Sequence, residues 1–599
     1  MAQPFQGETI QWQEWHAEAF QLAERESKPI LLTLTATWCH WCHVLDQTSY
    51  AHPNVISLIN TRFIPIRVDV DRRPDLAVRY NQGGFPSVVI LNAQGTPLTG
   101  RVYVPPEEMV QLLHQVSEQY PAVRDTTSGD NTSQTGQTVR PAFLGTGDTP
   151  FDRVLQRLRA TYDKDFGGFG MEPKQPPWEA LALLLALYSR SGDKTLLQMT
   201  CTTLDNMWAG LYDRREQGFF RYAVSRDWQV PHYEKMLITN ANLCSVYLAA
   251  YQVTGRKRYR DTALGILRYL QERLYDPQQG VFYASQDAAE TYYRLPWKDR
   301  DHADPPRIDR TGYTGLNAAV ASACSAAYSV CDQETYLSLA TGVLDRLWSQ
   351  GWEAERGLRH IIDDPAFLPR FLTDHVALAG ALLEGYQVTG QPEWLDRAVV
   401  VVRRIHELFG SSEGGYYDSA ESSAEPTIWD ARHKPVLDNA RLAEVLVTLA
   451  TLTGEAHYQH LARQTLETFQ DSVPGHSYLG PAGLRRMEED EEVLFLPAGA
   501  AWGRAWAMLV HEPVHLVLVG SLTHATAREL FKAAQRVYVP HRVLQLLDPE
   551  RDAARIAALG FPHASTPALY VCMGGMCLAP IATPAEVRNL RTTRPWGIR

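Results

Sequence analysis

The sequence predicts a multidomain protein with an α/β domain, then an all-α toroid of six helical hairpins, then a small α/β segment. Two observations predict this order. Apolar runs typical of strands alternate with helical stretches before residue 124, and helical stretches separated by short turns repeat from about residue 151 to about residue 510. We expect a first domain over residues 1–123, a polar linker over 124–150, the toroid over 151–512 and the last segment over 513–599.

Composition narrows the functional classes. The net charge of −11 and the lack of a basic block argue against nucleic-acid binding. The chain has no run of 18 apolar residues and no basic-then-apolar N-terminal pattern, so we expect neither a membrane span nor a signal peptide. Eight cysteines in 599 residues do not form a disulfide framework. We therefore expect a reducing compartment, the cytoplasm.

A pair of cysteines, Cys39 and Cys42, follows an apolar strand-like run, Ile30 to Thr35, and opens a helix. A thiol at a helix N-terminus is close to unsatisfied N–H groups and the positive dipole end, which favour its thiolate. Protonated His40 and His43 would favour the thiolate further. The pattern predicts a redox site in which Cys39 is the attacking thiolate and Cys42 the resolving thiol.

Later stretches complete the first domain. Trp12 to Glu26 has helical periodicity, and Phe63 to Val70 is predicted as a second strand. The approach Gly83 to Pro86 leads directly into a third strand, which suggests a cis-proline facing the cysteines. With a hairpin and a final helix, this order resembles the thioredoxin fold over residues 10–120. The resemblance implies that Pro86 borders the substrate groove.

Two features depart from common thioredoxins. Many thioredoxins carry a buried carboxylate six residues before the first cysteine, as the proton acceptor of the second cysteine, and here that residue is Thr33. Between the cysteines, the bulky Trp41 is expected to cover the sulfur. Two alternatives to a working dithiol therefore stay open. One is a zinc site using Cys39, Cys42 and a histidine, for which no fourth ligand is evident, and the other is a fold kept for packing or docking.

Five helical stretches of the middle region end in a short turn, after which a second helix follows. The turns end at Gly192, Gly255, Asp332, Gly390 and Gly454, and glycine is the expected left-handed cap there. The first helix of each pair is apolar on nearly all sides, which predicts that it is buried. With Ala498 to Val510 as a sixth such helix, the pattern predicts an α/α toroid in which the N-terminal ends of the inner helices surround one pocket.

The predicted rim of this pocket is polar and aromatic, as a sugar site requires. The architecture resembles the six-hairpin glycosidases and the N-acylglucosamine 2-epimerases, which bind sugars in such a pocket. Glu234, Asp287 and Asp374 are candidate carboxylates for hydrolysis, and His232 and His375 are candidate bases for epimerisation. The other predicted pocket residues are Lys174, Trp178, Tyr233, Lys235, Asn240 and Asp438, with Glu179, Asn317 and Asn439 also at the rim.

Several motifs follow one another in a fixed order: Cys39 to His43, Gly83 to Pro86, Gly167 to Gly170 and Pro231 to Leu237. This series resembles the thioredoxin-domain proteins related to spermatogenesis-associated protein twenty, in which a thioredoxin-like domain precedes an epimerase-like toroid. The resemblance implies a redox regulator without an assigned sugar reaction, and we expect no cofactor. Gln286 and the stretch Tyr313 to Gly315 depart from the family pattern, which weakens a claim of shared catalysis in the toroid.

The last segment is predicted as a small α/β unit. Val514 to Gly520 and Ala568 to Cys572 are expected to be strands, and Ala525 to Val537 a helix. Cys572 and Cys577 flank a glycine turn, and we expect them to lie near each other without bonding. A disulfide between them, or thiol exchange with the N-terminal pair, is the alternative.

Together these patterns predict a thiol–disulfide redox protein whose thioredoxin-like site is coupled to a carbohydrate-type pocket. The expected partners are a protein thiol or disulfide and a small sugar ligand, with neither nucleic acid nor membrane. One alternative is a sugar-modifying enzyme, of the epimerase or glycoside hydrolase type, with a non-catalytic thioredoxin-like domain. The other is a non-catalytic scaffold or zinc-binding protein.

Overall fold

The computed structural model describes residues 9–123, 149–420, 432–471, 491–562, 566–574 and 576–593. The chain divides into two compact units. The first is made of Met1–Gly147, Glu421–His433 and Ser477–Glu491, and the second of Asp148–Ala420, Lys434–His476 and Glu492–Arg599. Nearly all of the predicted linker, residues 124–150, lies outside the described residues.

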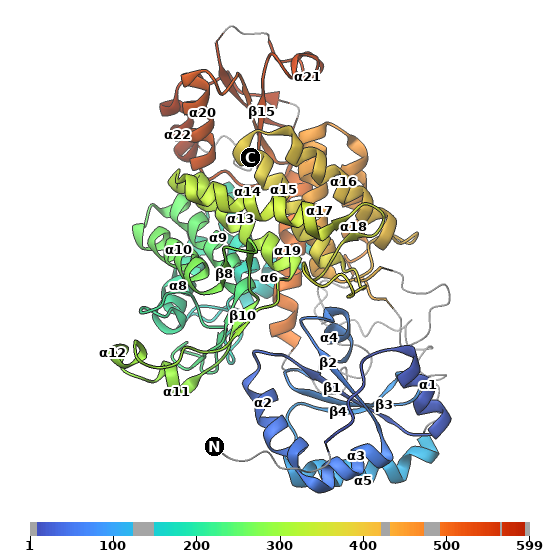
Figure 1. Cartoon of the computed structure of the whole chain (residues 1–599). Coiled ribbons are helices and arrows are strands. Elements are labelled where there is room, and N and C mark those ends of the chain that lie inside the picture. The colour runs from blue at the N-terminus through green and yellow to red at the C-terminus, as the bar shows by residue number, and fades with distance from the viewer. Residues whose placement is uncertain are drawn as a thin grey trace. The chain divides into compact units, whose positions relative to one another are not determined.

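A four-stranded sheet in the order β2-β1-β3-β4 forms the centre of the first unit (Figure 1). β1 (Ile30–Thr35) pairs parallel with β2 (Ile64–Asp69) and antiparallel with β3 (Ser87–Leu91), which pairs antiparallel with β4 (Pro97–Arg101). The helices are α1 (Ala17–Glu26), α2 (His40–Gln47), η1 (Ser49–Ala51), α3 (Pro53–Arg62), α4 (Pro74–Tyr80) and α5 (Pro106–Val123). Every residue of β1 is buried, as expected of a central strand. The prediction of a thioredoxin-like domain is confirmed.

The second unit contains the predicted helical toroid (Figure 1). The inner helices are α7 (Trp178–Ser191), α9 (Leu237–Thr254), α13 (Thr314–Cys331), α15 (Leu372–Thr389), α17 (Val436–Thr453) and α19 (Glu491–His511). The outer helices are α6 (Pro150–Thr161), α8 (Lys194–Leu211), α10 (Lys257–Tyr269), α14 (Glu334–Arg346), α16 (Pro392–Phe409) and α18 (Ala456–Glu467). Neighbouring inner helices pack on one another from α7 through α17. A Cβ at Gly503 of α19 would lie 3.2 Å from Val154 of α6 and 3.3 Å from Leu183 of α7, so these helices close the ring.

The predicted left-handed caps are present at the ends of five inner helices. Gly192, Gly255, Gly390 and Gly454 have positive φ, and Asp332 takes the same conformation after α13. A single left-handed residue ends each inner helix here, and the chain then reverses direction and enters the outer helix. The toroid prediction is therefore confirmed at the level of its individual hairpins.

Short strands and helices connect the hairpins at the other end of the toroid. The strands are β5 (Tyr222–Ala223), β6 (Pro231–His232), β7 (Lys235–Met236), β8 (Tyr275–Asp276), β9 (Val281–Phe282), β10 (Ser285–Gln286), β11 (Ile308–Asp309), β12 (Trp352–Glu353) and β13 (Gly357–Leu358). The helices are α11 (Glu290–Tyr293) and α12 (Trp297–Arg300), and single π-turns, η2 (Leu270–Leu274) and η3 (Leu347–Gly351), end α10 and α14. Among the described residues, no helix is both long and apolar enough to span a membrane.

The C-terminal part of the second unit repeats the sheet of the first unit. Its strands are β14 (Val514–Val519), β15 (Arg542–Leu547), β16 (Ala568–Met573) and β17 (Met576–Cys577), in the order β15-β14-β16-β17. β14 pairs parallel with β15 and antiparallel with β16, and β16 pairs antiparallel with β17. The helices are α20 (Ala525–Arg536), α21 (Ala553–Ala558) and α22 (Pro584–Thr593). Strand order and directions therefore match those of β2-β1-β3-β4, a likeness that the sequence did not indicate.

Candidate functional site

Cys39 and Cys42 lie at the start of α2, as the sequence predicts. Cys39 is the N-cap residue of this helix, and its Sγ accepts the backbone N–H of Cys42 at 3.2 Å. Both side chains are buried, with residue exposures of 3% and 2%. An N-cap sulfur takes the position of a capping oxygen, where negative charge is stabilised by the first turn of the helix. This geometry suits Cys39 as the thiolate of the pair.

The two thiols influence each other directly. The hydrogen bond from Cys39 lowers the pKa of Cys42, while burial raises it. The hydroxyl of Thr35 and the backbone of Ala36 lower the pKa of Cys42 further, and the negative charge of Asp46 raises it. The net effect is that the pKa of the Cys42 thiol lies below its ordinary value.

Pro86 follows a cis peptide bond, as predicted. The ring of the preceding residue, Phe85, meets the ring of Trp38 edge-on, with centroids 6.2 Å apart. Trp38 directly precedes Cys39 and donates from its Nε1 to Asp71 Oδ2 at 2.6 Å. The loop that carries Pro86 is thus packed beside the start of the cysteine motif.

The residues between and after the cysteines lie partly at the surface. Trp41 is 46% exposed, and its ring packs against Tyr103 with centroids 5.3 Å apart. About half of the Trp41 surface is thus accessible to solvent, and its covering of a cysteine sulfur stays a prediction. The ring of His40 meets Trp41 edge-on, and His43 is half-buried.

Thr33 and Tyr50 occupy the interior below the motif. The Thr33 hydroxyl lies 2.5 Å from the Tyr50 hydroxyl, and both side chains are buried. Burial raises the pKa of Tyr50, so its phenol is neutral. The position that the sequence identified as lacking a carboxylate is therefore filled by a neutral hydrogen-bonded pair.

Two predicted pocket lysines are fully buried in the toroid core. Lys174 donates to Asp163 Oδ2 at 2.8 Å and to two carbonyls of the preceding loop. Lys235 donates in the same way to Asp213 Oδ2 at 2.8 Å and to one loop carbonyl. Burial lowers the pKa of both lysines, and the paired aspartates oppose this shift. The prediction that these residues line the pocket is corrected, because the amines hold adjacent loops together.

Asn240 is also buried and binds loop backbone, so the prediction that it lines the pocket is corrected. Its Oδ1 accepts the backbone N–H of Phe219 at 2.7 Å, and its Nδ2 donates to the carbonyls of Phe219 at 3.1 Å and Met236 at 2.9 Å. Asn317 and Asn439 bind the backbones of Phe282 and Tyr416 in the same way. Each asparagine is the fourth residue of its inner helix and fixes the Gly-aromatic loop before that helix.

His375 is likewise the fourth residue of its helix, α15, and it also binds the backbone of the preceding loop. Its Nε2 accepts the backbone N–H of Leu358 at 2.8 Å, and its Nδ1 donates to the carbonyl of Phe371 at 2.8 Å. Burial lowers its pKa to about 4. Both ring nitrogens are occupied, so the prediction of His375 as a candidate base is corrected.

Three predicted acids do lie together at the N-terminal ends of inner helices. Glu179 of α7 accepts a hydrogen bond at Oε1 from Arg441 Nε of α17, at 3.0 Å. Its other oxygen, Oε2, lies 2.8 Å from Arg504 Nη1 of α19. Burial raises the pKa of Asp438, Arg441 opposes this, and the charges of Asp374 and Glu179 add to it. The cluster therefore offers one carboxyl that favours protonation beside carboxylates that are ion-paired or hydrogen-bonded.

His360 joins this cluster, although sequence reasoning missed it. Its Nδ1 lies 2.7 Å from Asp374 Oδ2, and Asp374 Oδ1 accepts the backbone N–H of Gly315 at 3.1 Å. His360 and Asp374 are both buried. The histidine lies in a loop without a motif, so only the fold shows its partner. Arg441 of α17 and Arg504 of α19 were also missed, because their partner Glu179 is far away in the sequence.

His232 and Glu234 form a second pair. His232 Nδ1 lies 2.7 Å from Glu234 Oε2, and its ring stacks on Tyr222 with centroids 4.8 Å apart. Glu234 is 1% exposed, and its Oε1 has no hydrogen-bond partner among the described residues. The structure thus brings together the two residues that the Pro-His-Tyr-Glu-Lys motif predicted for the pocket.

The remaining predicted pocket residues make other contacts. Tyr233 stacks on Tyr293 with centroids 5.3 Å apart. Trp178 begins α7, and its Nε1 is buried without a hydrogen-bond partner in the part of the chain that is described. Asp287 accepts the backbone N–H of Ala288 at 2.8 Å. None of these contacts links the three side chains to the Glu179 cluster.

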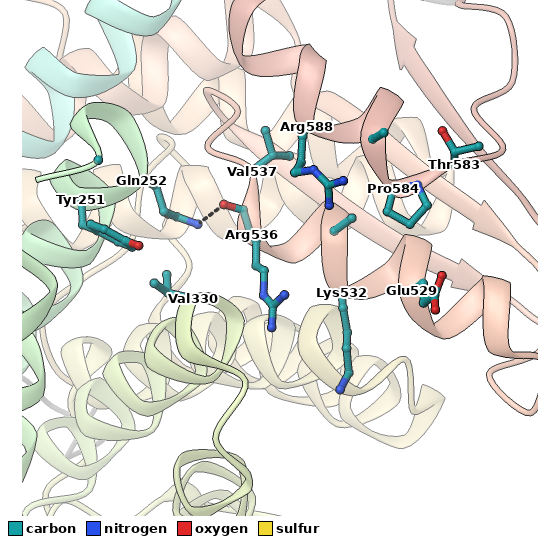
Figure 2. Close-up of a pocket in the computed structure, with 13 residues that line it drawn as sticks. Tyr251, Gln252, Val330, Glu529, Lys532, Arg536, Val537, Thr583, Pro584 and Arg588 are labelled. Atoms are coloured by element: carbon teal, nitrogen blue, oxygen red, sulfur yellow. Dashed lines mark hydrogen bonds between the residues drawn. The ribbon is translucent and has the colours of Figure 1, made fainter. Parts of the chain in front are cut away.

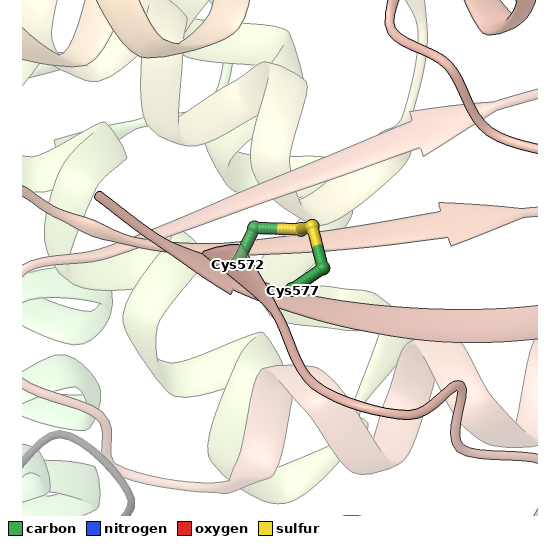
Figure 3. Close-up of a disulfide and its surroundings, with 2 residues drawn as sticks. All are labelled: Cys572 and Cys577. Carbon is green, nitrogen blue, oxygen red and sulfur yellow. A yellow bond between two sulfur atoms is a disulfide. The ribbon is translucent and has the colours of Figure 1, made fainter. Parts of the chain in front are cut away.

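Cys572 and Cys577 form a disulfide across the β16–β17 hairpin (Figure 3). The two residues are direct cross-strand partners, with Cα atoms 4.0 Å apart. The favoured prediction of unbonded neighbours is wrong, because the hairpin places the two side chains face to face. Gly574 has φ of +54° and allows this tight turn.

A cavity of about 850 Å³ lies at the far end of the toroid from the predicted rim. Figure 2 shows the C-terminal ends of α9 and α13 on one side of it and α20 and α22 on the other. Its cations include Lys532 and Arg536, which both pair with Asp332. None of the predicted pocket residues lines it.

Two protein-family models match the chain. Residues 3–139 match Thioredox_DsbH, described as a protein of unknown function, DUF255. Residues 155–304 match the N-acylglucosamine 2-epimerase model. The two matches fall on the thioredoxin-like sheet and on the first hairpins of the toroid.

Three curated relatives match different shares of the chain. Spermatogenesis-associated protein 20 of Homo sapiens is 24% identical over 97% of this chain and 89% of its own length. Thioredoxin H-type of Fagopyrum esculentum is 34% identical over 18% of this chain and 86% of its own length. Disulfide bond reductase DsbH of Chlamydia pneumoniae is 25% identical over 17% of this chain and 68% of its own length. The chain is therefore a homologue of spermatogenesis-associated protein 20 and joins a thioredoxin-like domain to a toroid of the N-acylglucosamine 2-epimerase type.

Proposed function

We propose that the chain is a thiol–disulfide oxidoreductase that acts through Cys39 and Cys42. The observation that carries this proposal is the N-cap position of Cys39, whose sulfur accepts the N–H of Cys42. Thiolate at this position is stabilised by the helix, and a second thiol one turn later can resolve a mixed disulfide. A relative named as a disulfide bond reductase supports the same chemistry for this domain. The partner would be a protein thiol or disulfide.

A redox titration of the full chain tests this proposal. The protein is equilibrated in glutathione buffers, free thiols are alkylated, and each cysteine is read by mass spectrometry. A reversible two-electron couple at Cys39 and Cys42, between about −120 and −270 mV, is expected of a thioredoxin-like enzyme. Cys39→Ser and Cys42→Ser should each abolish it. Thiols that stay reduced across this range would contradict the proposal.

The acid cluster of the toroid favours a second candidate activity, a sugar reaction. His360 beside Asp374, and Asp438 with its raised pKa, supply a base and an acid in one place. The test is turnover of N-acetylglucosamine and of disaccharides followed by NMR. Loss of turnover in Asp438→Asn with retention in Cys39→Ser would assign the activity to the toroid. No turnover by the wild-type chain would remove this candidate.

A further inference from the structure

The disulfide between Cys572 and Cys577 has no part in the chemistry proposed above. The chain has eight cysteines, all within the described residues, and six of them are free thiols: Cys39, Cys42, Cys201, Cys244, Cys324 and Cys331. The hairpin of β16 and β17 therefore holds the one oxidised cysteine pair of the chain. The same chain thus carries a dithiol suited to exchange and a disulfide with which a dithiol can react.

The hairpin disulfide lies at the surface of the second unit. Strand β17 is the last strand of its sheet, so in the described part of the chain no further strand covers its outer edge. Met576 is 77% exposed and Leu578 is 41% exposed, and Cys577 between them is exposed as well. Cys572 is half-buried and packs against the apolar cluster of β14 and β16. An incoming thiolate can therefore reach the bond from the side of Cys577.

The backbone holds this hairpin together without the sulfur–sulfur bond. Leu578 donates its N–H to the carbonyl of Val571 at 2.9 Å, and Leu569 and Ile581 exchange two backbone hydrogen bonds, at 2.9 Å and 2.8 Å. The disulfide closes a loop with a sequence separation of only 5 residues, so it restricts the unfolded chain less than a long loop would. The bond can therefore open and close while the sheet stays folded, as a reversible redox group requires.

Cys39 is suited to a disulfide that stands out from its own surface. It is the N-cap residue of α2 and is 3% exposed. A sulfur in this position cannot reach a disulfide enclosed in a core, because the two protein surfaces would have to overlap. An exposed disulfide on a two-residue edge strand such as β17 meets this requirement.

We propose that the Cys39–Cys42 dithiol of one copy of the chain reduces the Cys572–Cys577 disulfide of a second copy. This inference rests on the proposed function and names a partner for it. The Cys39 thiolate attacks Cys577 Sγ, the bond between Cys577 and Cys572 breaks, and Cys572 leaves as a thiolate. Cys42 then attacks Cys39 Sγ, and Cys577 leaves in turn. Two electrons pass from the first pair to the second, and the two protons of the dithiol end on Cys572 and Cys577.

The first measurement is electron transfer between two variants of the full chain. The donor is Cys572→Ser/Cys577→Ser with its N-terminal pair reduced, and the acceptor is Cys39→Ser/Cys42→Ser with its hairpin disulfide intact. After mixing with the donor in excess, alkylation and mass spectrometry should show one oxidised donor pair for each reduced acceptor hairpin. A hairpin that stays oxidised beside a donor with a working redox couple would overturn the proposal.

Two further variants are the controls for this transfer. Cys39→Ser in the donor should abolish it, because the attacking thiolate is then missing. Cys331→Ser in the acceptor removes a half-buried thiol of α13 and should leave the transfer unchanged. Transfer that persists without Cys39 would overturn the proposal.

The second measurement traps the mixed disulfide. When Cys42→Ser is added to the donor, no resolving thiol is present, so Cys39 should stay bonded to the acceptor. Non-reducing electrophoresis should show a covalent dimer, and peptide mass spectrometry should identify a bond between Cys39 and Cys577. A bond to Cys572, or no dimer at all, would overturn the proposed order of attack.

A third measurement separates this proposal from the proposed function, because it does not use Cys39 or Cys42. Dithiothreitol should reduce the hairpin disulfide of the acceptor variant, and the circular dichroism spectrum should not change. A bond that resists dithiothreitol, or a fold that is lost on reduction, would overturn this proposal even when Cys39 and Cys42 form a working couple. A donor in which these two cysteines form no couple would instead contradict the proposed function.

Discussion

His375 and Leu358 are joined by a hydrogen bond in which the imidazole Nε2 accepts the backbone N–H at 2.8 Å. This bond requires the neutral ring, because a protonated Nε2 has no lone pair to offer. The asparagines at the equivalent fourth positions of α9, α13 and α17 make the same contact without a titratable group. One inner helix of the toroid therefore uses a pH-sensitive residue where three others do not.

The stability of the chain should fall in mild acid because of this histidine. The pKa of His375 is about 4 in the fold and about 6.5 in the unfolded chain, so the unfolded state binds more protons between these values. Stability is full above about pH 6.5 and falls as the pH drops toward 4, by up to about 3 kcal/mol. His515 and His541, with pKa values lowered by burial to about 4 and about 3, act in the same direction. Urea unfolding at several pH values measures this slope.

His375→Asn is the matched variant for this prediction. It copies the residue found at the equivalent position of α9 and should keep the fold while reducing the acid slope. His375→Ala leaves the Leu358 N–H without its partner and should cost about 1–3 kcal/mol at neutral pH. An acid slope that is identical in His375→Asn and in the wild type would contradict the assignment.

The buried pair of Lys235 and Asp213 should matter for stability. Both side chains are almost fully buried and lie 2.8 Å apart. Without the lysine, the cation that still pairs with Asp213 among the described residues is Arg300, at 3.4 Å. Lys235→Ala should therefore destabilise the toroid by about 3–5 kcal/mol. Thermal unfolding measures this, with Lys257→Ala on an exposed site of α10 as control. A stable Lys235→Ala variant that lost only ligand binding would restore the pocket interpretation.

The sequence predicts the repeated units of this fold well because each is local. Strand periodicity and the cysteine spacing indicate the first domain, and the caps from Gly192 to Gly454 indicate the hairpins. It predicts the pocket poorly, since a polar residue at a helix start looks the same whether it faces a cavity or a loop backbone. Lys235 and Asn240 illustrate this, because their partners come from an earlier loop. The pair of Glu179 and Arg441 is separated by 262 residues, and no local pattern reveals it.

The Cys572–Cys577 disulfide should contribute modestly to stability. It closes a short hairpin with a sequence separation of 5 residues, and a loop of this size corresponds to about 2 kcal/mol in the chain-entropy description. The double variant Cys572→Ser/Cys577→Ser should therefore lower the free energy of unfolding by about this amount or less and should leave the sheet folded. Urea unfolding with and without a reductant provides the comparison. A loss of folding in the double variant would show that the hairpin depends on its crosslink.

The ion pairs of Glu179 should stabilise the closed ring of inner helices. It is the residue of α7 that binds Arg441 of α17 and Arg504 of α19, and Arg504 also binds Glu444 of α17 at 2.6 Å. Glu179→Gln removes one negative charge between two largely buried guanidinium groups and should cost about 3 kcal/mol. The loss should be larger than for Glu334→Gln, an exposed acid of α14, when both are compared by thermal unfolding.

Because Asp438 lies beside the same charges, the pKa of its carboxyl should fall when Glu179 is neutralised, and NMR titration of Asp438 would detect that shift. A pKa of Asp438 that stays the same in Glu179→Gln would show that the three acids do not form one cluster.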